Sequence, residues 1–243
     1  MIGPRTAREN DEYARVVYDD TSVYVNKLDI RDQASLEKIE RYLAATRAKQ
    51  GFPTRANFRN YNGFKAIHRH LFQDIYGWAG RERRYTTGRG AAPFAVPEYI
   101  ETWMTQQFAT LRAEKYLVGR SLDDFAAAVA KYVNEINAAH PFVDGNGRTQ
   151  RSWLRMFADN AGFELRLTER DVRRWNDASA RGFKASDHAP MAALLKERLK
   201  GHVSGAPTTS KKRRARKKRC RQRCCVRQSA LLEVSLYSAN VTY

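Results

Sequence analysis

Apolar residues recur at intervals of three and four along most of the chain. The clearest stripe lies within residues 121–138 and comprises Leu122, Phe125, Val129, Tyr132, Val133 and Ile136. This spacing places side chains on one face of an α-helix. Similar patterns predict further helices over residues 32–49, 62–77, 98–114, 148–161, 168–183 and 188–200. The pattern therefore predicts an all-α fold, a bundle of about seven or eight helices.

One segment interrupts the helical pattern. Residues 81–97 contain two glycines and two prolines, and their apolar residues follow no helical period. Glycine and proline at this density favour turns over helix. A short β-hairpin fits such a segment best. We therefore expect one hairpin, placed between the second and third predicted helices.

Composition divides the chain into three parts. Residues 1–25 are polar and rich in tyrosine and predict an N-terminal arm, residues 26–203 predict the folded domain, and residues 204–243 predict a disordered tail. Within the tail, residues 211–223 hold ten Lys and Arg and no acid, so the formal charge of +18 falls to +8 without them. Such a run is either a solvated tail without a dedicated partner or a contact to nucleic acid or an anionic membrane.

The cysteines and the apolar segments exclude several classes of protein. All three cysteines lie in the tail, at Cys220, Cys224 and Cys225. The folded domain therefore has neither a disulfide scaffold nor a thiol nucleophile. The N-terminus shows no apolar signal segment, and no stretch approaches the ~18 continuous apolar residues of a membrane span. We expect a protein that acts in the cytoplasm, its own or that of a host into which it is secreted as an effector.

The chemistry of the chain is concentrated in residues 140–151, which read His-Pro-Phe-Val-Asp-Gly-Asn-Gly-Arg-Thr-Gln-Arg. Histidine ionises near pH ~6.5, so His140 suits a general base at neutral pH. Gly145 and Gly147 can adopt positive φ, which lets the backbone N–H groups between them turn toward an anion. The helix predicted to follow points the positive end of its dipole at the same place. This part of the segment predicts an anion-binding loop.

Charged side chains complete the segment. Arg148 and Arg151 are three residues apart, so both can reach one side of the predicted helix, and their planar guanidinium groups suit phosphate oxygens. Asp144 offers the hard oxygen ligand that Mg²⁺ prefers when it binds through one carboxylate and substrate phosphates. A base, a metal ligand, an anion-binding loop and an arginine pair in one stretch indicate a site that handles phosphates.

The segment resembles the signature of the Fic family, His-x-Phe-x-Asp/Glu-Gly-Asn-Gly-Arg-x-x-Arg, and every specified position is filled. The resemblance implies the Fic fold, with a β-hairpin flap next to the active site. It also implies protein adenylylation (AMPylation), the transfer of AMP from ATP to a Tyr, Thr or Ser hydroxyl of a target protein, with release of pyrophosphate. In this scheme His140 is the catalytic base and Asp144 holds Mg²⁺. The implied nucleotide-binding residues are Gly145, Asn146, Gly147, Arg148 and Arg151, the last of them at the γ-phosphate.

A second segment supports the resemblance. Residues 71–80 contain Tyr-Gly-Trp-Ala-Gly, which resembles the family's Tyr-x-Trp-Ala-Gly helix end, and the predicted hairpin at 81–97 follows directly. In the family this hairpin is the flap, and its edge binds a segment of the target by strand addition. Arg89 and Gly90 stand where relatives often have Lys-Gly, so the resemblance places them near the nucleotide.

The resemblance also bears on regulation. Many Fic enzymes are inhibited by a glutamate that pairs with the second arginine of the signature, here Arg151. The inhibitory motif resembles Ser/Thr-x-x-x-Glu-Gly/Asn, and this chain does not contain it. Residues 46–51 have Gln in place of the glutamate, and residues 229–234 have Val in place of the small residue. The chain therefore resembles the toxin-like class, in which a small separate antitoxin supplies the glutamate.

Two alternatives stay open at this point. The same scaffold can transfer UMP or another phosphate-linked group. A non-enzymatic alternative is a docking module that binds anionic partners through the basic tail and carries a vestigial Fic-like loop. No specified position of the signature is degraded, which favours the enzyme.

Overall fold

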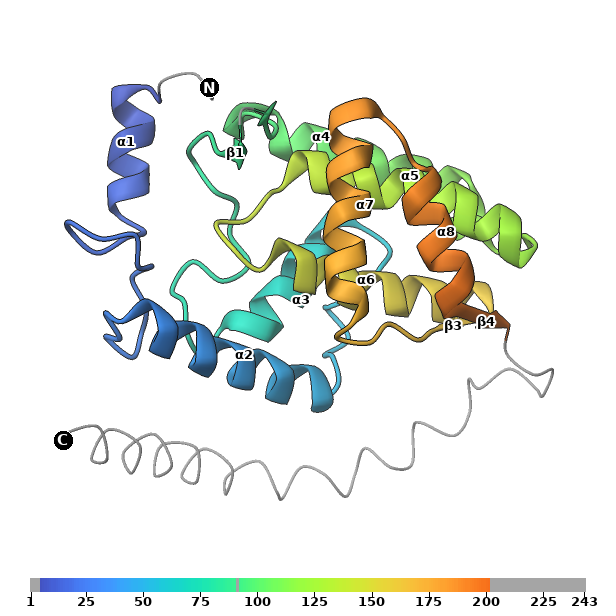
Figure 1. Cartoon of the computed structure of the whole chain (residues 1–243), viewed down its shortest axis with the longest axis horizontal. Helices are drawn as coiled ribbons and strands as arrows, with labels where there is room; N and C mark the ends of the chain where they lie inside the picture. The colour runs from blue at the N-terminus through green and yellow to red at the C-terminus, as the bar shows by residue number, and fades with distance from the viewer. Residues whose placement is uncertain (1–4, 91, 202–243) are drawn as a thin grey trace. The chain divides into compact units, whose positions relative to one another are not determined.

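The computed structural model of the chain describes residues 5–90 and 92–201. These residues form eight α-helices and two short pairs of antiparallel strands (Figure 1). The helices are α1 (Ala7–Ala14), α2 (Gln33–Lys49), α3 (Tyr61–Phe72), α4 (Pro97–Ala113), α5 (Leu122–Ala139), α6 (Asn146–Ala161), α7 (Asp171–Ala185) and α8 (Ala189–Arg198). The strands are β1 (Gly88–Arg89), β2 (Ala92–Pro93), β3 (Phe163–Leu165) and β4 (Leu199–Gly201), and a 3₁₀ turn spans Lys115–Leu117. The predicted all-α fold with a hairpin between α3 and α4 is confirmed.

Local sequence explains where the predicted helices begin. The Asp32 carboxylate accepts the backbone N–H of Ser35 at 2.8 Å, at the start of α2. The Ser121 hydroxyl accepts the N–H of Asp124 at 3.2 Å, at the start of α5. Each side chain satisfies an N–H group that the first helical turn leaves without a partner. Both caps confirm helix starts that the sequence predicts.

The helix predicted over residues 62–77 is wrong at its C-terminal end, because α3 ends at Phe72. The next carbonyls are bound by a segment far away in the sequence. Lys27 donates its backbone N–H to the Ile75 carbonyl at 2.7 Å and its ammonium group to the Gln73 carbonyl at 2.8 Å. The chain between Phe72 and the hairpin is therefore shaped by tertiary contacts and follows no helical period.

The N-terminal arm contains a helix that the sequence did not predict. Helix α1 begins with a capping box between Thr6 and Glu9. The Glu9 carboxylate also accepts the backbone N–H of Thr86 at 2.7 Å, and Arg5 donates to the Thr86 carbonyl at 2.9 Å. Hydrogen bonds from Thr86 and Thr6 lower the pKa of Glu9 to about 2. The arm thus contacts the segment that leads into the hairpin.

Helix α5 lies at the centre of the fold and packs against α4, α6, α7 and α8. Figure 1 shows α3 and α6 between α5 and α2, in agreement with the contacts of α3 with α2 and α6. The core between these helices is rich in aromatic rings with almost no exposure: Phe64, Phe72, Phe125, Phe142, Trp153 and Phe157. Phe142 stacks on Phe64 with centroids 5.7 Å apart, so the loop after α5 is anchored in the core.

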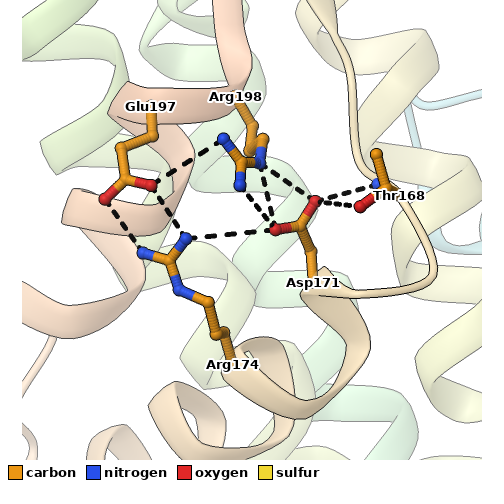
Figure 2. Close-up of polar contacts among 5 residues, drawn as sticks. All are labelled: Thr168, Asp171, Arg174, Glu197 and Arg198. Atoms are coloured by element: carbon orange, nitrogen blue, oxygen red, sulfur yellow. Dashed lines mark hydrogen bonds and ion pairs between the residues drawn. The ribbon is translucent and has the colours of Figure 1, made fainter.

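Strands β3 and β4 were not predicted, and they end the helix predicted over 188–200 at Arg198. Beside them, Figure 2 shows an ionic cluster that ties the start of α7 to the end of α8. Asp171 accepts the N–H of Thr168 at 2.9 Å and Nε of Arg198 at 3.0 Å. These hydrogen bonds, with Arg198 first, hold the pKa of the Asp171 carboxyl well below its usual range. The cluster fixes the layer that covers one side of α5.

No helix in residues 5–90 and 92–201 is long and apolar enough to cross a membrane.

Candidate active site

His140 lies at the point where α5 ends. It is the C-terminal cap residue of α5 and adopts φ 43° and ψ 60°, in the left-handed region. Pro141 follows, and a proline disfavours the helical conformation of the residue before it. The imidazole of His140 lies parallel to the ring of Phe94, with centroids 4.0 Å apart and an interplanar angle of 3°. The chain reversal after α5 thus presents His140 against the segment that follows β2.

The surroundings of His140 favour the neutral imidazole. Burial is the main cause, followed by the positive charges of Arg83 and then Arg89, and together they lower the pKa of His140 to about 3. A backbone contact with Asn137 acts in the opposite direction and is outweighed. Nδ1 of His140 is buried and has no hydrogen-bond partner among the described residues, so a substrate proton cannot reach it. Nε2 is therefore the nitrogen that can accept a proton. A neutral imidazole is the form that a general base needs, but a pKa of about 3 makes His140 a weaker base than the ordinary value of ~6.5 used in the sequence prediction.

The loop from His140 leads into the N-terminus of α6 through Gly145. This residue caps α6 with φ 77°, and a Cβ atom there would lie 2.4 Å from the ring of Phe72. Only glycine fits this conformation and this contact. No side chain caps α6, and the first helical hydrogen bond is that from Thr149 to the Gly145 carbonyl. The N–H groups of residues 146–148 are therefore without partners among the described residues, which makes an anion-binding helix end.

The side chain of Asn146 is used to shape this loop. Its Oδ1 accepts the backbone N–H of Phe142 at 2.9 Å, and its Nδ2 donates to the Phe142 carbonyl at 2.9 Å. Both polar atoms of the amide are thus engaged within the loop, which folds back on itself over four residues. The amide closes the loop, and the Asn146 backbone N–H stays at the open end of α6.

Asp144 sits at the rim of the loop, and its side chain is 46% exposed. One carboxylate oxygen accepts the N–H of Gly145 at 2.6 Å, and the other lies 3.5 Å from Nη2 of Arg148. The backbone of Asp144 is fixed by the core, because its carbonyl accepts Nε2–H of the fully buried His68 at 2.9 Å. His68 Nδ1 in turn accepts the N–H of Gly80 at 2.8 Å, which fixes the tautomer. His68 therefore ties the Trp-Ala-Gly turn to the loop.

The carboxylate of Asp144 fits a magnesium ligand. It is a hard oxygen donor, it is accessible, and among the described residues its second oxygen pairs only with Arg148, at 3.5 Å. The part of the chain that the structure describes contains no cluster of three or more His, Cys, Asp or Glu side chains that could bind a metal. Mg²⁺ commonly binds through one carboxylate together with substrate phosphates and water, and such a site needs no larger cluster.

Arg148 is held by a residue that the sequence reasoning missed. Its Nη2 lies 2.5 Å from the carboxylate of Glu40 on α2, and its guanidinium lies 4.6 Å from the ring centroid of Phe72. Tyr76 donates its hydroxyl to the other oxygen of Glu40. Burial raises the pKa of Glu40, and the charge of Arg148 opposes this shift. Glu40 therefore links α2 to the first arginine of the motif.

One signal could have revealed Glu40. It stands between Leu36 and Ala44 at intervals of four, and these three residues form the buried face of α2. Tyr42, an aromatic residue of the same helix, is 59% exposed and does not belong to this face. A carboxylate within an apolar stripe needs a buried partner, which points to a functional or structural pair.

Arg151 has a different environment. Among residues 5–90 and 92–201 no carboxylate pairs with it, and its guanidinium lies near Gly147, where a Cβ atom would be 3.1 Å from Nη1. Burial, and then the charges of Arg148 and Arg155, lower the pKa of Arg151 to about 10, so it stays protonated at neutral pH. A half-buried cation beside an uncapped helix N-terminus favours binding of an anion.

Arg89 and Gly90 lie in the hairpin, where β1 pairs with β2 through Gly88–Pro93 and Arg89–Ala92. Gly90 adopts φ 61° and forms part of the turn. Arg89 donates to the carbonyl of Asn176 on α7 at 3.2 Å, and its charge acts on His140. The structure brings Arg89 near His140. The assignment of Arg89 and Gly90 to the nucleotide stays a prediction.

Comparison with known proteins agrees with this geometry. The family model described as Fic/DOC family matches residues 59–158. The probable protein adenylyltransferase y4lH of Sinorhizobium fredii is 39% identical over 183 residues, which cover 75% of this chain and 94% of that protein. The probable protein adenylyltransferase Fic of Escherichia coli is 34% identical and covers 68% of this chain and 82% of that protein.

A solved structure shows the same fold. The crystal structure of BepC, a VirB-translocated effector protein of Bartonella tribocorum with bound AMPPNP, superposes with a TM-score of 0.70 at 24% identity, and the match covers 77% of this chain and 97% of that one. The matches to this chain span 94% and 82% of the two relatives, and both relatives are named as probable protein adenylyltransferases. The chain therefore belongs to the Fic/DOC family and is a protein adenylyltransferase.

Proposed function

We propose that this chain transfers AMP from ATP to a Tyr, Thr or Ser hydroxyl of a target protein, with His140 as the general base. The observation that carries the proposal is the arrangement of three features within one loop. A neutral, left-handed His140 ends α5, the N-terminus of α6 is uncapped, and Arg151 has no counter-ion among the described residues. A base and an anion site separated by one short loop suit attack on a phosphate.

The nucleotide is bound by the start of α6. The backbone N–H groups of Asn146, Gly147 and Arg148 would donate to phosphate oxygens, with the positive end of the helix dipole behind them. Arg151 would bind the γ-phosphate, because it is the arginine of the motif without a carboxylate partner in the described part of the chain. Gly145 lets the loop pack directly on the ring of Phe72, since no side chain fits between them.

The reaction is a single displacement at the α-phosphorus. The target hydroxyl oxygen forms a bond to this phosphorus while the bond to the β-phosphate oxygen breaks, so AMP is transferred and pyrophosphate leaves. Nε2 of His140 takes the hydroxyl proton. The chain contributes chiefly by position and charge, as in other phosphoryl transfers. Asp144 would hold Mg²⁺, which would neutralise charge on the phosphate oxygens.

Labelled ATP tests the proposal. The full chain is incubated with α-³²P-ATP and a cell lysate, and the same mixture is prepared with γ-³²P-ATP. We expect a labelled protein band with the α-label alone, and none with the His140→Ala variant. Label from γ-³²P-ATP would show phosphate transfer and would overturn the proposal. Competition with unlabelled UTP distinguishes the second candidate, transfer of UMP or another phosphate-linked group.

We also infer that a separate protein inhibits this enzyme. The support is Arg151, which makes no ion pair with a carboxylate among residues 5–90 and 92–201. Of the two segments near the inhibitory motif, residues 46–51 end α2 and carry Gln50 in place of a glutamate, and residues 229–234 lie outside the described residues. A small antitoxin would supply a glutamate to Arg151 and exclude the γ-phosphate. Co-expression with neighbouring small open reading frames, followed by AMP-transfer assays, tests this: one of them should silence the wild-type chain.

We propose that the target binds by strand addition at the hairpin formed by β1 and β2, within residues 81–97. Strands β1 and β2 form a ladder of only two residue pairs, which leaves edge N–H and C=O groups for another chain. Ala92→Pro removes the N–H of a residue that pairs with Arg89 and so disrupts the hairpin that offers this edge. It should reduce labelling of the target and leave ATP affinity unchanged. Whether the chain acts in its own cytoplasm or in that of a host stays a prediction.

A further inference from the structure

Arg83 is a buried cation that the proposed mechanism does not use. It is 2% exposed and lies between the Trp-Ala-Gly turn and the hairpin. No carboxylate among the described residues pairs with its guanidinium. Burial lowers the pKa of Arg83 to about 10, so it remains charged at neutral pH.

The guanidinium binds only backbone carbonyls. Its Nε donates to the His140 carbonyl at 2.8 Å, and its Nη1 donates to the Tyr85 carbonyl at 2.7 Å. Its Nη2 donates to the Ala139 carbonyl at 3.1 Å and also to the Ala95 carbonyl. A buried charge without a counter-ion is costly, and carbonyls at the C-terminal end of α5 offset this cost only partly. A buried charge that lowers stability in this way, next to His140, suggests that Arg83 has a functional role.

The four carbonyls belong to two structures that must meet for catalysis. Tyr85 and Ala95 flank residues 86–94, which contain the hairpin, whereas Ala139 and His140 end α5. Other contacts join the same two structures: the Arg83 N–H donates to the Pro141 carbonyl at 2.8 Å, and the Ala95 N–H donates to the Ala138 carbonyl at 3.0 Å. Arg83 is thus the side chain through which both ends of the hairpin are attached to the catalytic loop.

We propose that Arg83 is a positioning residue that holds the hairpin in register with His140, so that a target bound at the hairpin presents its hydroxyl to the catalytic base. This inference rests on the proposed function of His140. Two features of the site support it. The ring of Phe94, which lies between β2 and Ala95, stacks on the His140 imidazole with centroids 4.0 Å apart. The strained left-handed conformation of His140 is held by the hydrogen bond that its carbonyl accepts from Arg83.

The charge of Arg83 has a second effect on the same histidine. The charged side chains that act on His140 are Arg83, before the hairpin, and Arg89, on β1, while α7 contributes the ring of Phe183, which packs on Phe94. Both charged groups are cations and disfavour a second positive charge on the imidazole. Removal of the Arg83 charge should therefore raise the pKa of His140. A residue that served only to fill the core would have no such effect.

The test compares Arg83→Gln, Arg83→Lys and the matched control Arg84→Gln in the full chain. Arg84 is the next residue, but its side chain is 72% exposed and lies 3.8 Å from Glu12. Three quantities are measured: kcat for AMP transfer to target in lysate, the Kd of a fluorescent ATP analogue, and the pKa of His140 by ¹⁵N NMR of labelled histidine. The resonance of His140 is identified by its loss in His140→Ala.

Arg83→Gln should lower kcat by about 100-fold, because a displacement near 1 Å at the reacting atoms has this effect. Arg83→Lys keeps the charge but bonds to fewer carbonyls, so kcat should fall by roughly 10-fold. Both should leave the Kd of the nucleotide unchanged. The pKa of His140 should rise in Arg83→Gln and stay low in Arg83→Lys. Arg84→Gln should match the wild type in the nucleotide Kd and in the His140 pKa.

Two results would overturn the proposal. One is a variant Arg83→Gln whose kcat and His140 pKa both equal those of the wild type. The other is a parallel loss of nucleotide affinity and kcat with an unchanged His140 pKa, which would make Arg83 a general element of the fold. The NMR titration needs no catalysis, so it tests Arg83 even if AMP transfer itself fails. Arg83→Lys keeps the test decisive if Arg83→Gln does not fold.

Discussion

The carboxylate of Glu40 lies 2.5 Å from Nη2 of Arg148 and joins α2 to α6. Glu40 is 6% exposed, and Tyr76 of the Trp-Ala-Gly segment donates to its second oxygen. The motif of residues 140–151 and the segment of residues 71–80, which are separate in the sequence, therefore both contact the buried carboxylate of Glu40. A charge buried in this way is stable only while its partners are in place.

Replacement of Glu40 by glutamine should weaken both folding and nucleotide binding. The amide replaces one of the two acceptor oxygens by a donor group, so Tyr76 and Arg148 can no longer each donate to an oxygen of its own. We expect the free energy of unfolding to fall by about 1–3 kcal/mol, the usual cost of a buried polar group without a partner. Urea denaturation measures this change, and ATP titration measures the loss of affinity. Glu37→Gln, an exposed position on the same helix, is the control, and equal effects of both variants would contradict the role of Glu40.

His140→Ala should abolish AMP transfer and leave ATP bound. A general base contributes about 10²–10⁴-fold to the rate, whereas the anion-binding N–H groups belong to α6 and do not depend on the imidazole. Transfer is measured with α-³²P-ATP and binding by calorimetry. A large loss of ATP affinity in His140→Ala would show that the histidine contacts the nucleotide and would contradict its assignment as the base.

Arg151→Gln should weaken ATP binding more than ADP binding. Arg151 is assigned to the γ-phosphate, and a charge-assisted hydrogen bond contributes about 1.5–3 kcal/mol, or roughly 10–100-fold in Kd. The ratio of the ATP and ADP dissociation constants is the quantity to measure. Arg155→Gln, one turn farther along α6, should change this ratio little. An equal loss for ATP and ADP would place Arg151 at another phosphate.

The protein should lose stability between about pH 7.5 and about pH 5, because His68 and His140 are buried in the neutral form with pKa values near 3. In the unfolded chain each ionises near its ordinary value of ~6.5, so the unfolded state binds more protons as the pH falls. Each histidine then lowers the free energy of unfolding by about 2 kcal/mol at pH 5. Urea denaturation at both pH values should show a smaller loss in His140→Gln, and an equal loss would contradict a neutral buried His140.

The carboxylates with lowered pKa values do not confuse this measurement. The pKa of Asp171, in the cluster of Figure 2, lies below its usual range, and that of Glu9 is about 2. Their contributions are complete above the pKa values of the unfolded carboxyls, which lie near ~4. They are lost only as the pH falls further, toward the folded pKa values. The effect of the histidines is thus separated from theirs by pH alone.

The sequence predicts what is local in this protein. The stripe through Phe125, Val129 and Val133 predicts α5 within one residue at each end, because burial of one helical face dictates the apolar period. The residues of the loop motif are contiguous, so their proximity follows from chain connectivity. The prediction of the hairpin likewise depends on the glycines and prolines within it.

What the sequence does not predict depends on partners far away in the chain. Glu40 is an ordinary surface residue by type, and only the fold brings it to Arg148. Arg83 binds backbone carbonyls, and because every residue has a carbonyl, the sequence does not show which of them Arg83 binds. Helix α3 ends at Phe72, and Lys27 binds the carbonyls of Gln73 and Ile75 beyond it. In each case a tertiary contact overrides local propensity.

Deletion of residues 205–243 should leave AMP transfer intact. Every residue assigned to the site, from Glu40 to Arg151, lies in the described part of the chain, and β4 ends that part at Gly201. The deletion removes the ten basic residues of 211–223, so binding to DNA or to anionic vesicles should become weaker and less dependent on salt. The assay compares α-³²P-ATP labelling and salt-titrated binding for both chains. A loss of labelling that parallels the loss of binding would show that the tail belongs to the catalytic unit.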